Sequence, residues 1–214
     1  MIAAYKKLPV ITMAVIALGQ AHASVVYTST PSPVSVGLLA SSNTTTYGQV
    51  FTAPSGSDTQ LDSFGLYING TLTSAYGGVA TWTGTGAGTS LFTSAVFPAV
   101  YATLTEVTIN TGGVALTPGQ QYVAYFSVSG IFGNSGEDFM SLGLGSALGG
   151  GFAYDNANGG SPLHNNWSCQ GACGYGSAAY HMTFNAPGHV PEPISLALVG
   201  LGLVGIAATR RKGA

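Results

Sequence analysis

Basic side chains are missing from most of this chain. The 214-residue sequence has five Lys and Arg residues, and all lie near its ends: Lys6, Lys7, Arg210, Arg211 and Lys212. The stretch from Ser24 to Val190 contains none, and its six acidic residues give it a formal charge of −6. Nucleic-acid binding is excluded, because it needs clustered Lys and Arg to neutralise phosphates. Phosphoryl transfer through a Lys or Arg clamp is disfavoured for the same reason.

The first 23 residues have the pattern of a secretory signal peptide. Two lysines precede an eleven-residue apolar stretch from Leu8 to Leu18. Ala21 and Ala23 then frame a small-residue cleavage site before Ser24. Because eleven apolar residues are too few to span a bilayer, a membrane helix is disfavoured here. We therefore predict export, with residues 1–23 removed.

Residues 190–214 have the order of a membrane-sorting tail. The segment contains a motif, an apolar stretch and a basic cluster, in the order Pro191-Glu192-Pro193, 194–209 and Arg210-Arg211-Lys212. Fifteen apolar or small residues reach about 22 Å as a helix, which crosses a bilayer where the membrane thins or the flanks snorkel. Basic residues after such a run stay cytoplasmic, so the upstream domain faces outward. We predict a C-terminal transmembrane helix in the inner membrane.

This three-part tail resembles the PEP-CTERM sorting signal of Gram-negative bacteria. The resemblance covers residues 190–214 and rests on the motif Pro191-Glu192-Pro193, the Gly- and Leu-rich apolar stretch and the basic end. In that family an exosortase, a membrane protease-transpeptidase, processes the protein near the motif. Members are typically exported by organisms that also make exopolysaccharide. The resemblance implies an exosortase-type partner, an inner-membrane anchor before processing, and a final place in the cell envelope or outside the cell.

The stretch between these ends, residues 24–189, reads as one domain built from strands. Bulky residues alternate or nearly alternate with small and polar ones in three stretches, at Leu61–Ile68, Leu104–Ile109 and Gln121–Val128. Breaks rich in Gly, Ser, Thr and Asn separate such stretches, at Thr83–Gly88, Gly112–Gly113 and Gly130–Gly136. This pattern predicts an all-β fold, an antiparallel β-sandwich that is jelly-roll-like.

A turn and a tyrosine support the sandwich. Pro118 and Gly119 suit the two central positions of a type II turn. Tyr122 follows three residues after Gly119, where its hydroxyl can return to the backbone upstream, as in the tyrosine corner of Greek-key sandwiches. The pair supports the fold and implies no site.

The only two cysteines are Cys169 and Cys173. In an oxidising compartment outside the inner membrane, a disulfide between them is the expected state. Its short loop removes little chain entropy, so it would mainly stiffen a local turn. A zinc site is disfavoured, because only His164 and His181 lie nearby.

Trp167 is the candidate for a glycan contact. It follows Asn165 and Asn166 in a polar segment, and a tryptophan face packs on the apolar C–H face of a sugar while amides bond its hydroxyls. Tyr154 and Tyr175 are candidate neighbours. The alternative is that Trp167 covers the core beneath a loop, and the sequence leaves both open.

Oxygen ligands for calcium form a second candidate set. These residues are Asn134, Glu137, Asp138, Asp155, Asn156 and Asn158. Their spacing does not match an EF-hand loop, and a solvated acidic loop explains them equally well. We predict no cofactor, with calcium as the alternative.

Catalysis is disfavoured. Glycoside hydrolysis needs two converging carboxylates, whereas the adjacent Glu137 and Asp138 point to opposite faces of an extended segment. No Gly-x-Ser-x-Gly elbow or His-Glu-x-x-His pair occurs between the two ends. A lyase built from a Tyr and a His stays open, because residues distant in sequence can meet in the fold. We predict a non-enzymatic protein.

These patterns lead to three functional hypotheses. The first is an exported sandwich, sorted through its tail, with a structural or adhesive role associated with exopolysaccharide. The second is a glycan-binding module centred on Trp167. The third and weakest is a carbohydrate-active enzyme.

Overall fold

The protein is described by a computed structural model that covers residues 24–40, 44–156, 160–168 and 175–187. His22–His189 form one compact unit. Within the described ranges no helix is long and apolar enough to cross a membrane. The predicted signal peptide, both cysteines, Asn158 and the predicted C-terminal helix lie outside these ranges.

Twelve strands make up the regular structure of this unit. They are β1 (Val25–Leu39), β2 (Thr46–Thr52), β3 (Gln60–Gly70), β4 (Ser74–Trp82), β5 (Ala87–Thr93), β6 (Phe97–Pro98), β7 (Tyr101–Ala115), β8 (Gln121–Ser127), β9 (Asp138–Leu144), β10 (Phe152–Asp155), β11 (Ser177–Ala178) and β12 (Tyr180–Asn185). The three predicted strand stretches fall in β3, β7 and β8, which confirms them as strands apart from Val128, the residue after β8.

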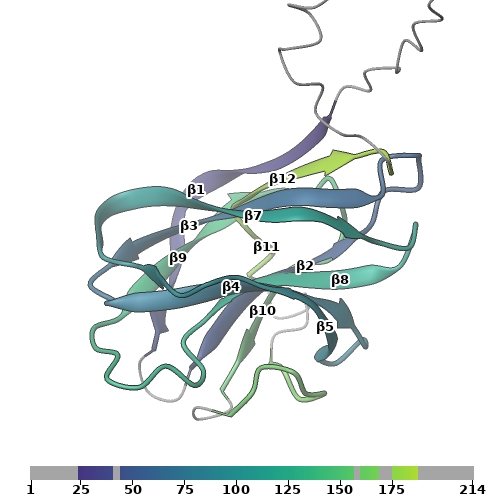
Figure 1. Ribbon diagram of the computed structural model, residues 1–214. Coiled ribbons are helices and arrows are strands. Elements are labelled where there is room, and N and C mark those ends of the chain that lie inside the picture. Colours follow the sequence, from purple (N-terminus) through teal and green to yellow (C-terminus); the bar gives the residue numbers. More distant parts are fainter. Residues whose placement is uncertain (1–23, 41–43, 157–159, 169–174, 188–214) are drawn as a thin grey trace, which may run out of the picture. The chain divides into compact units, whose positions relative to one another are not determined.

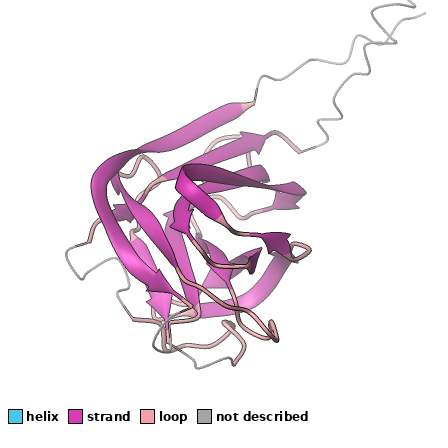
Figure 2. Cartoon of the chain, turned by 90° about the vertical axis from the view of Figure 1, so that its left-hand side faces the viewer, coloured by secondary structure: helices cyan, strands magenta, loops and turns pink. Residues whose placement is uncertain are grey.

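The strands form two antiparallel sheets that face each other (Figure 1). The first sheet has the order β11–β9–β1–β12–β3–β7, and the second has the order β10–β2–β8–β4–β5 with β6 paired to β4. Every strand pairing is antiparallel. Figure 2 shows the same strands from the side that lies on the left of Figure 1, with loops joining them. The predicted all-β antiparallel sandwich is therefore confirmed.

The predicted break at Gly112–Gly113 is wrong, because both glycines lie inside β7. Their φ angles of +70° and +89° belong to the left-handed region that glycine adopts at little cost. The ladder between β3 and β7 shifts register here, between Leu61 and Ser63. The glycines thus form a bulge that bends a long strand rather than a turn that ends it.

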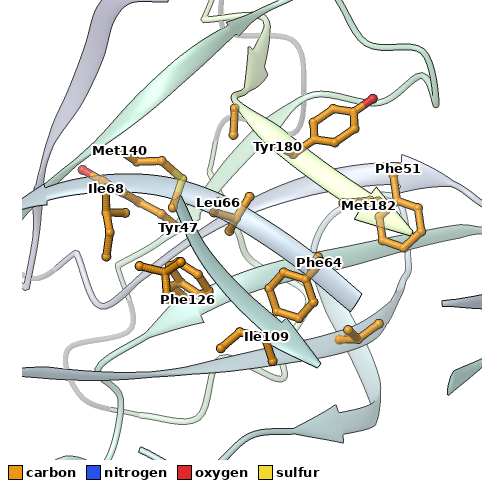
Figure 3. Packing of buried hydrophobic residues seen from close by; sticks show 14 of the residues in the cluster. Tyr47, Phe51, Phe64, Leu66, Ile68, Ile109, Phe126, Met140, Tyr180 and Met182 are labelled. Atoms are coloured by element: carbon orange, nitrogen blue, oxygen red, sulfur yellow. The ribbon is translucent and has the colours of Figure 1, made fainter. Parts of the chain in front are cut away.

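The main core lies between the two sheets, as Figure 3 shows from close by. Phe64, Leu66 and Ile68 point inward from β3 at alternating positions and are fully buried. Phe51 and Phe126 meet them from the second sheet. Full burial of one such side chain stabilises the fold by about 1.5–3 kcal/mol, which explains why the alternation in sequence decides the register.

A smaller apolar cluster lies on the other face of the second sheet. Along β8, Tyr122, Ala124 and Phe126 face the main core, whereas Val123 and Tyr125 belong to this second cluster. Its remaining buried members are Val50, Ala80, Ala87, Ala153 and Trp167. The second sheet is therefore apolar on both faces, and the segment that carries Trp167 covers the outer one.

The predicted turn and tyrosine bond are confirmed. Gly119 has a φ of +74°, and the Gln120 N–H donates to the Thr117 carbonyl at 3.2 Å, as a type II turn requires. The Thr117 N–H donates to the Tyr122 hydroxyl at 2.8 Å. Tyr122 thereby pins the turn to the strand that follows it.

Candidate functional site

Trp167 is buried, with 1% of its surface exposed. Its ring packs edge-on against Trp82 and Tyr125, with centroids 5.8 and 5.9 Å away. The indole N–H donates to the Pro162 carbonyl at 2.8 Å, and the backbone N–H donates to the Thr85 carbonyl at 3.0 Å. The buried indole ring of Trp167 leaves no exposed face on which a sugar could stack. The alternative interpretation therefore applies: Trp167 covers the core beneath a loop.

The two asparagines next to Trp167 are exposed and help to hold this loop. The Asn165 Oδ1 accepts from the Thr83 hydroxyl at 2.9 Å. The Asn166 backbone N–H donates to His164 Nδ1 at 3.2 Å. Of the two tyrosines predicted as neighbours, Tyr175 is 47% exposed and Tyr154 is half-buried. Tyr175 packs against Phe152.

His164 anchors the same loop to β10. Its Nε2 lies 2.8 Å from Oδ1 of Asp155, a buried residue at the end of that strand. Because Nδ1 accepts a backbone N–H, the ring proton resides on Nε2 and is donated to the carboxylate. Both ring nitrogens are occupied within the fold. The pair therefore fastens the loop over the second apolar cluster, and neither nitrogen is positioned as a free base.

A second histidine and a carboxylate meet on the outer face of the first sheet. His181 Nδ1 on β12 lies 3.1 Å from Glu106 Oε1 on β7. Tyr67 on β3 donates its hydroxyl proton to Glu106 Oε2 at 2.7 Å. Gly65 leaves the space for this, since a Cβ there would lie 2.6 Å from Glu106 Oε1.

The chemistry of this Tyr67–Glu106–His181 group is set by the tyrosine. Burial raises the pKa of Tyr67 to about 12, and the hydrogen bond to Glu106 and its negative charge add to the effect. A phenolate that acts as a base near neutral pH is therefore disfavoured. A Tyr and a His, the pair from which a lyase site could be built, are joined here through Glu106. The group could not be predicted from the sequence, because its members lie on three strands whose pairing the sequence does not reveal.

Asp138 is a buried carboxyl at the start of β9. It is 0% exposed, and its Oδ1 accepts the Leu72 N–H at 3.0 Å. Its Oδ2 is buried and has no hydrogen-bond partner among the described residues. Burial raises the pKa of Asp138 to about 6, and the Leu72 hydrogen bond opposes part of that rise. The carboxyl therefore titrates close to the physiological range.

Two of the predicted calcium ligands, Asn134 and Asn156, have structural partners of their own. Asn134 Oδ1 accepts from the Thr73 hydroxyl and the Ser74 N–H, and its amide donates to the Ser74 carbonyl. Asn156 Oδ1 accepts from the Thr44 hydroxyl at 2.7 Å. Within the described residues no three His, Cys, Asp or Glu side chains are placed to hold a metal ion.

Comparison with known protein families identifies a motif at the C-terminal end of the chain. Residues 189–212 match the PEP-CTERM protein-sorting motif. Proteins with this motif are exported and sorted to the cell surface, and the motif implies processing by an exosortase. The chain thus carries the sorting signal that its tail resembles. The curated proteins and the solved structures gave no match.

Proposed function

We propose that the protein is a structural or adhesive component of the cell envelope or extracellular matrix, associated with exopolysaccharide. The observation that carries the proposal is the sorting motif over residues 189–212. A domain whose described residues form strands and loops, with no Lys or Arg between Ser24 and Val190, fits this role, because it offers no basic cluster to bind anionic partners. The role that we propose is non-enzymatic, and the two His–carboxylate pairs of the described residues support it, because each joins two strands or a loop and a strand.

Intact-mass analysis of the protein from its native host tests the proposal. We expect a species in the matrix fraction that lacks residues 1–23 and the tail after the Pro191-Glu192-Pro193 region. Replacing these three residues by alanine should block C-terminal processing and retain the protein in the inner membrane. Pro187→Ala is the matched control, since Pro187 lies just upstream of the matched residues and should leave processing intact. A full-length C-terminus on matrix-located protein would contradict processing.

Glycan binding is the second candidate function. Because Trp167 is buried, a glycan-binding surface must be centred on another residue. A module that binds polysaccharide needs an accessible aromatic face and hydroxyl partners. Unlike Trp167, the aromatic residue Phe132 is almost completely exposed.

A further inference from the structure

Strand β7 is an edge of the first sheet. It pairs with β3 along one side, and no strand of the described residues pairs with its other side. The backbone of an edge strand presents N–H and C=O groups that form hydrogen bonds with another strand placed beside it. Proteins usually protect such an edge by a short length, a bulge, a covering segment, or Lys and Pro residues.

The other strands at the ends of the two sheets are protected in these ways. β11 has two residues, and β10 has four and forms a bridge from Tyr154 to Ser168 of the covering loop. β5 pairs with β4 through two register shifts, which interrupt its edge. In contrast, β7 pairs with β3 without a register shift over six residues, from Thr105 to Asn110. Its edge is therefore long and regular.

The open edge also lacks the residues that block pairing. Residues 105–111 read Thr-Glu-Val-Thr-Ile-Asn-Thr and contain no Lys, Arg or Pro. Five of these seven residues are β-branched, a composition that favours strands. Glu106 is the one charged residue among them, and its carboxylate contacts Tyr67 and His181 on its own sheet. This edge is therefore suited to pairing with a further strand.

The apolar side chains of the edge complement those of a second copy of the same edge. In an antiparallel pair of two β7 strands centred on Thr108, Val107 of each copy lies opposite Ile109 of the other. Both residues face the core and are almost buried within one copy, at 9% and 8% exposed. Opposed β-branched residues of this kind stabilise a sheet. The core-facing side of the sheet thus continues from one copy into the next.

The polar side chains of the outer face match in the same register. Glu106 of each copy lies opposite Asn110 of the other, and the two Thr108 residues lie opposite each other. Asn110 Oδ1 accepts the Gly112 N–H at 3.1 Å, which leaves the amide N–H groups to donate to the carboxylate. A pair centred on Glu106 instead would place two carboxylates opposite each other, which is destabilising. Self-pairing about Thr108 therefore satisfies every side chain of this face.

The second sheet extends the same contact. β5, the edge of that sheet, contacts β7, so the two edges lie on one side of the sandwich. A two-fold axis through Thr108, perpendicular to the first sheet, places the β5 strands of two copies on the same side of their contact. Leu91 on β5 is 37% exposed and adds apolar area there.

We propose that β7 pairs antiparallel with β7 of a second copy, so that two domains share one continuous sheet. The partner is a second copy because a two-fold pair of this edge matches its own apolar and polar residues. The proposal also rests on the proposed function, since sorting to a matrix brings identical copies together at high local concentration. Pairing of this kind would supply cohesion between copies of a matrix protein.

Sedimentation velocity of the protein purified from its native host tests the pairing. Because a single strand pair buries less than a standard interface, we expect a monomer–dimer equilibrium with a Kd on the order of 10 μM. Asn110→Asp keeps the acceptor for the Gly112 N–H but places a carboxylate opposite Glu106 twice in each dimer, and should raise the Kd at least about tenfold. Asn166→Asp is the matched control, since it adds the same charge at an exposed position away from β7 and should leave the Kd unchanged.

A double variant tests the register. Glu106→Gln combined with Asn110→Asp exchanges the acid and the amide, so it should restore the Kd to within about threefold of the wild type. Hydrogen exchange gives a readout that needs no variant: the amides of residues 105–111 should exchange more slowly as the protein concentration rises.

Several outcomes would overturn this pairing. These are a monomer at concentrations up to about 100 μM, equal effects of Asn110→Asp and Asn166→Asp, no recovery in the double variant, or slowed exchange elsewhere but not in residues 105–111. Each can occur while processing and matrix location are as proposed. A protein that is absent from the matrix would overturn the proposed function, whereas the association of the purified protein would stand.

Discussion

Asp138 is a carboxyl that the fold buries with a partner for only one of its two oxygens. Burial raises its pKa from 3.8 to about 6. The folded state therefore binds the proton more tightly than the unfolded state, and the free energy of unfolding falls as the pH rises from about 4 to about 6. Two pKa units correspond to about 3 kcal/mol.

We expect Asp138→Asn to remove this titration. The Asn Oδ1 keeps the acceptor for the Leu72 N–H, while the amide carries no charge. The variant should be more stable than the wild type at pH 7, by at most about 3 kcal/mol, and should differ little from it at pH 3.5. Urea unfolding between pH 3.5 and pH 8 measures this difference. Two stability curves that run parallel over the whole range would show that the Asp138 carboxyl is not the titrating group.

Substitution of Trp167 should lower the stability of the fold, whereas substitution of an exposed ligand-binding residue should not. Because it is 1% exposed and packs against Trp82 and Tyr125, Trp167→Ala should lower the free energy of unfolding by about 3–5 kcal/mol. Phe132→Ala is the natural comparison, since its ring is 99% exposed and its loss should cost less than about 0.5 kcal/mol. Denaturant unfolding of both variants measures the contrast. Equal costs would mean that Trp167 does not cover the core.

Single residues differ in how well their roles follow from the sequence. The Tyr122 bond to Thr117 is local, and the spacing from Pro118 and Gly119 was enough to predict it. The burial of Trp167 depends on β4 and β8, which supply its ring partners from far away in the chain. Its polar neighbours made the segment read as surface, although those neighbours in fact hold the loop in place.

Two glycines after β9 determine how the loop that leads to β10 passes close to β2. Gly145 and Gly150 both have positive φ angles, +84° and +67°. A Cβ at Gly145 meets nothing within 4 Å, whereas a Cβ at Gly150 would overlap the Val50 carbonyl on β2. The connection to β10 therefore depends on Gly150 for space and on both glycines for backbone conformation.

These two positions separate backbone strain from steric overlap. Gly145→Ala should cost about 1–2 kcal/mol, because an L-residue there adopts the left-handed region. Gly150→Ala should cost about 1–3 kcal/mol more, because β2 and the loop must also move apart. Thermal or urea unfolding of the pair gives the difference directly. Equal costs would show that the loop moves away from Val50 without penalty.

At the scale of single elements, the positions of the strands could be predicted from the sequence. The burial of the second sheet on both of its faces could not. The near-continuous apolar run in β8 fits a strand buried on both faces, but the sequence does not reveal which segment covers the outer face. The covering loop around Trp167 decides it. The bulge at Gly112–Gly113 was missed for a related reason, since two glycines mark a turn or a bulge equally well until the partner strand is known.

For the whole molecule, the class of fold followed from period-two alternation and turn residues. The order of strands did not, because β1 pairs with β12 and β9, both near the other end of the domain. The same non-local pairing assembles Tyr67, Glu106 and His181. Candidate sites that depend on such pairing become visible only in the folded chain.

The confinement of Lys and Arg to the ends also has a practical consequence. Among the described residues, His164 and His181 are the only side chains that can carry positive charge, and each contacts a carboxylate. Trypsin cuts after Lys and Arg, so it finds no bond to hydrolyse between Ser24 and Val190. The mature domain should survive tryptic digestion as one large fragment and escape peptide surveys that rely on that protease. Chymotrypsin, which cuts at aromatic residues, should reveal it, with the exposed Phe132 as an early cleavage point.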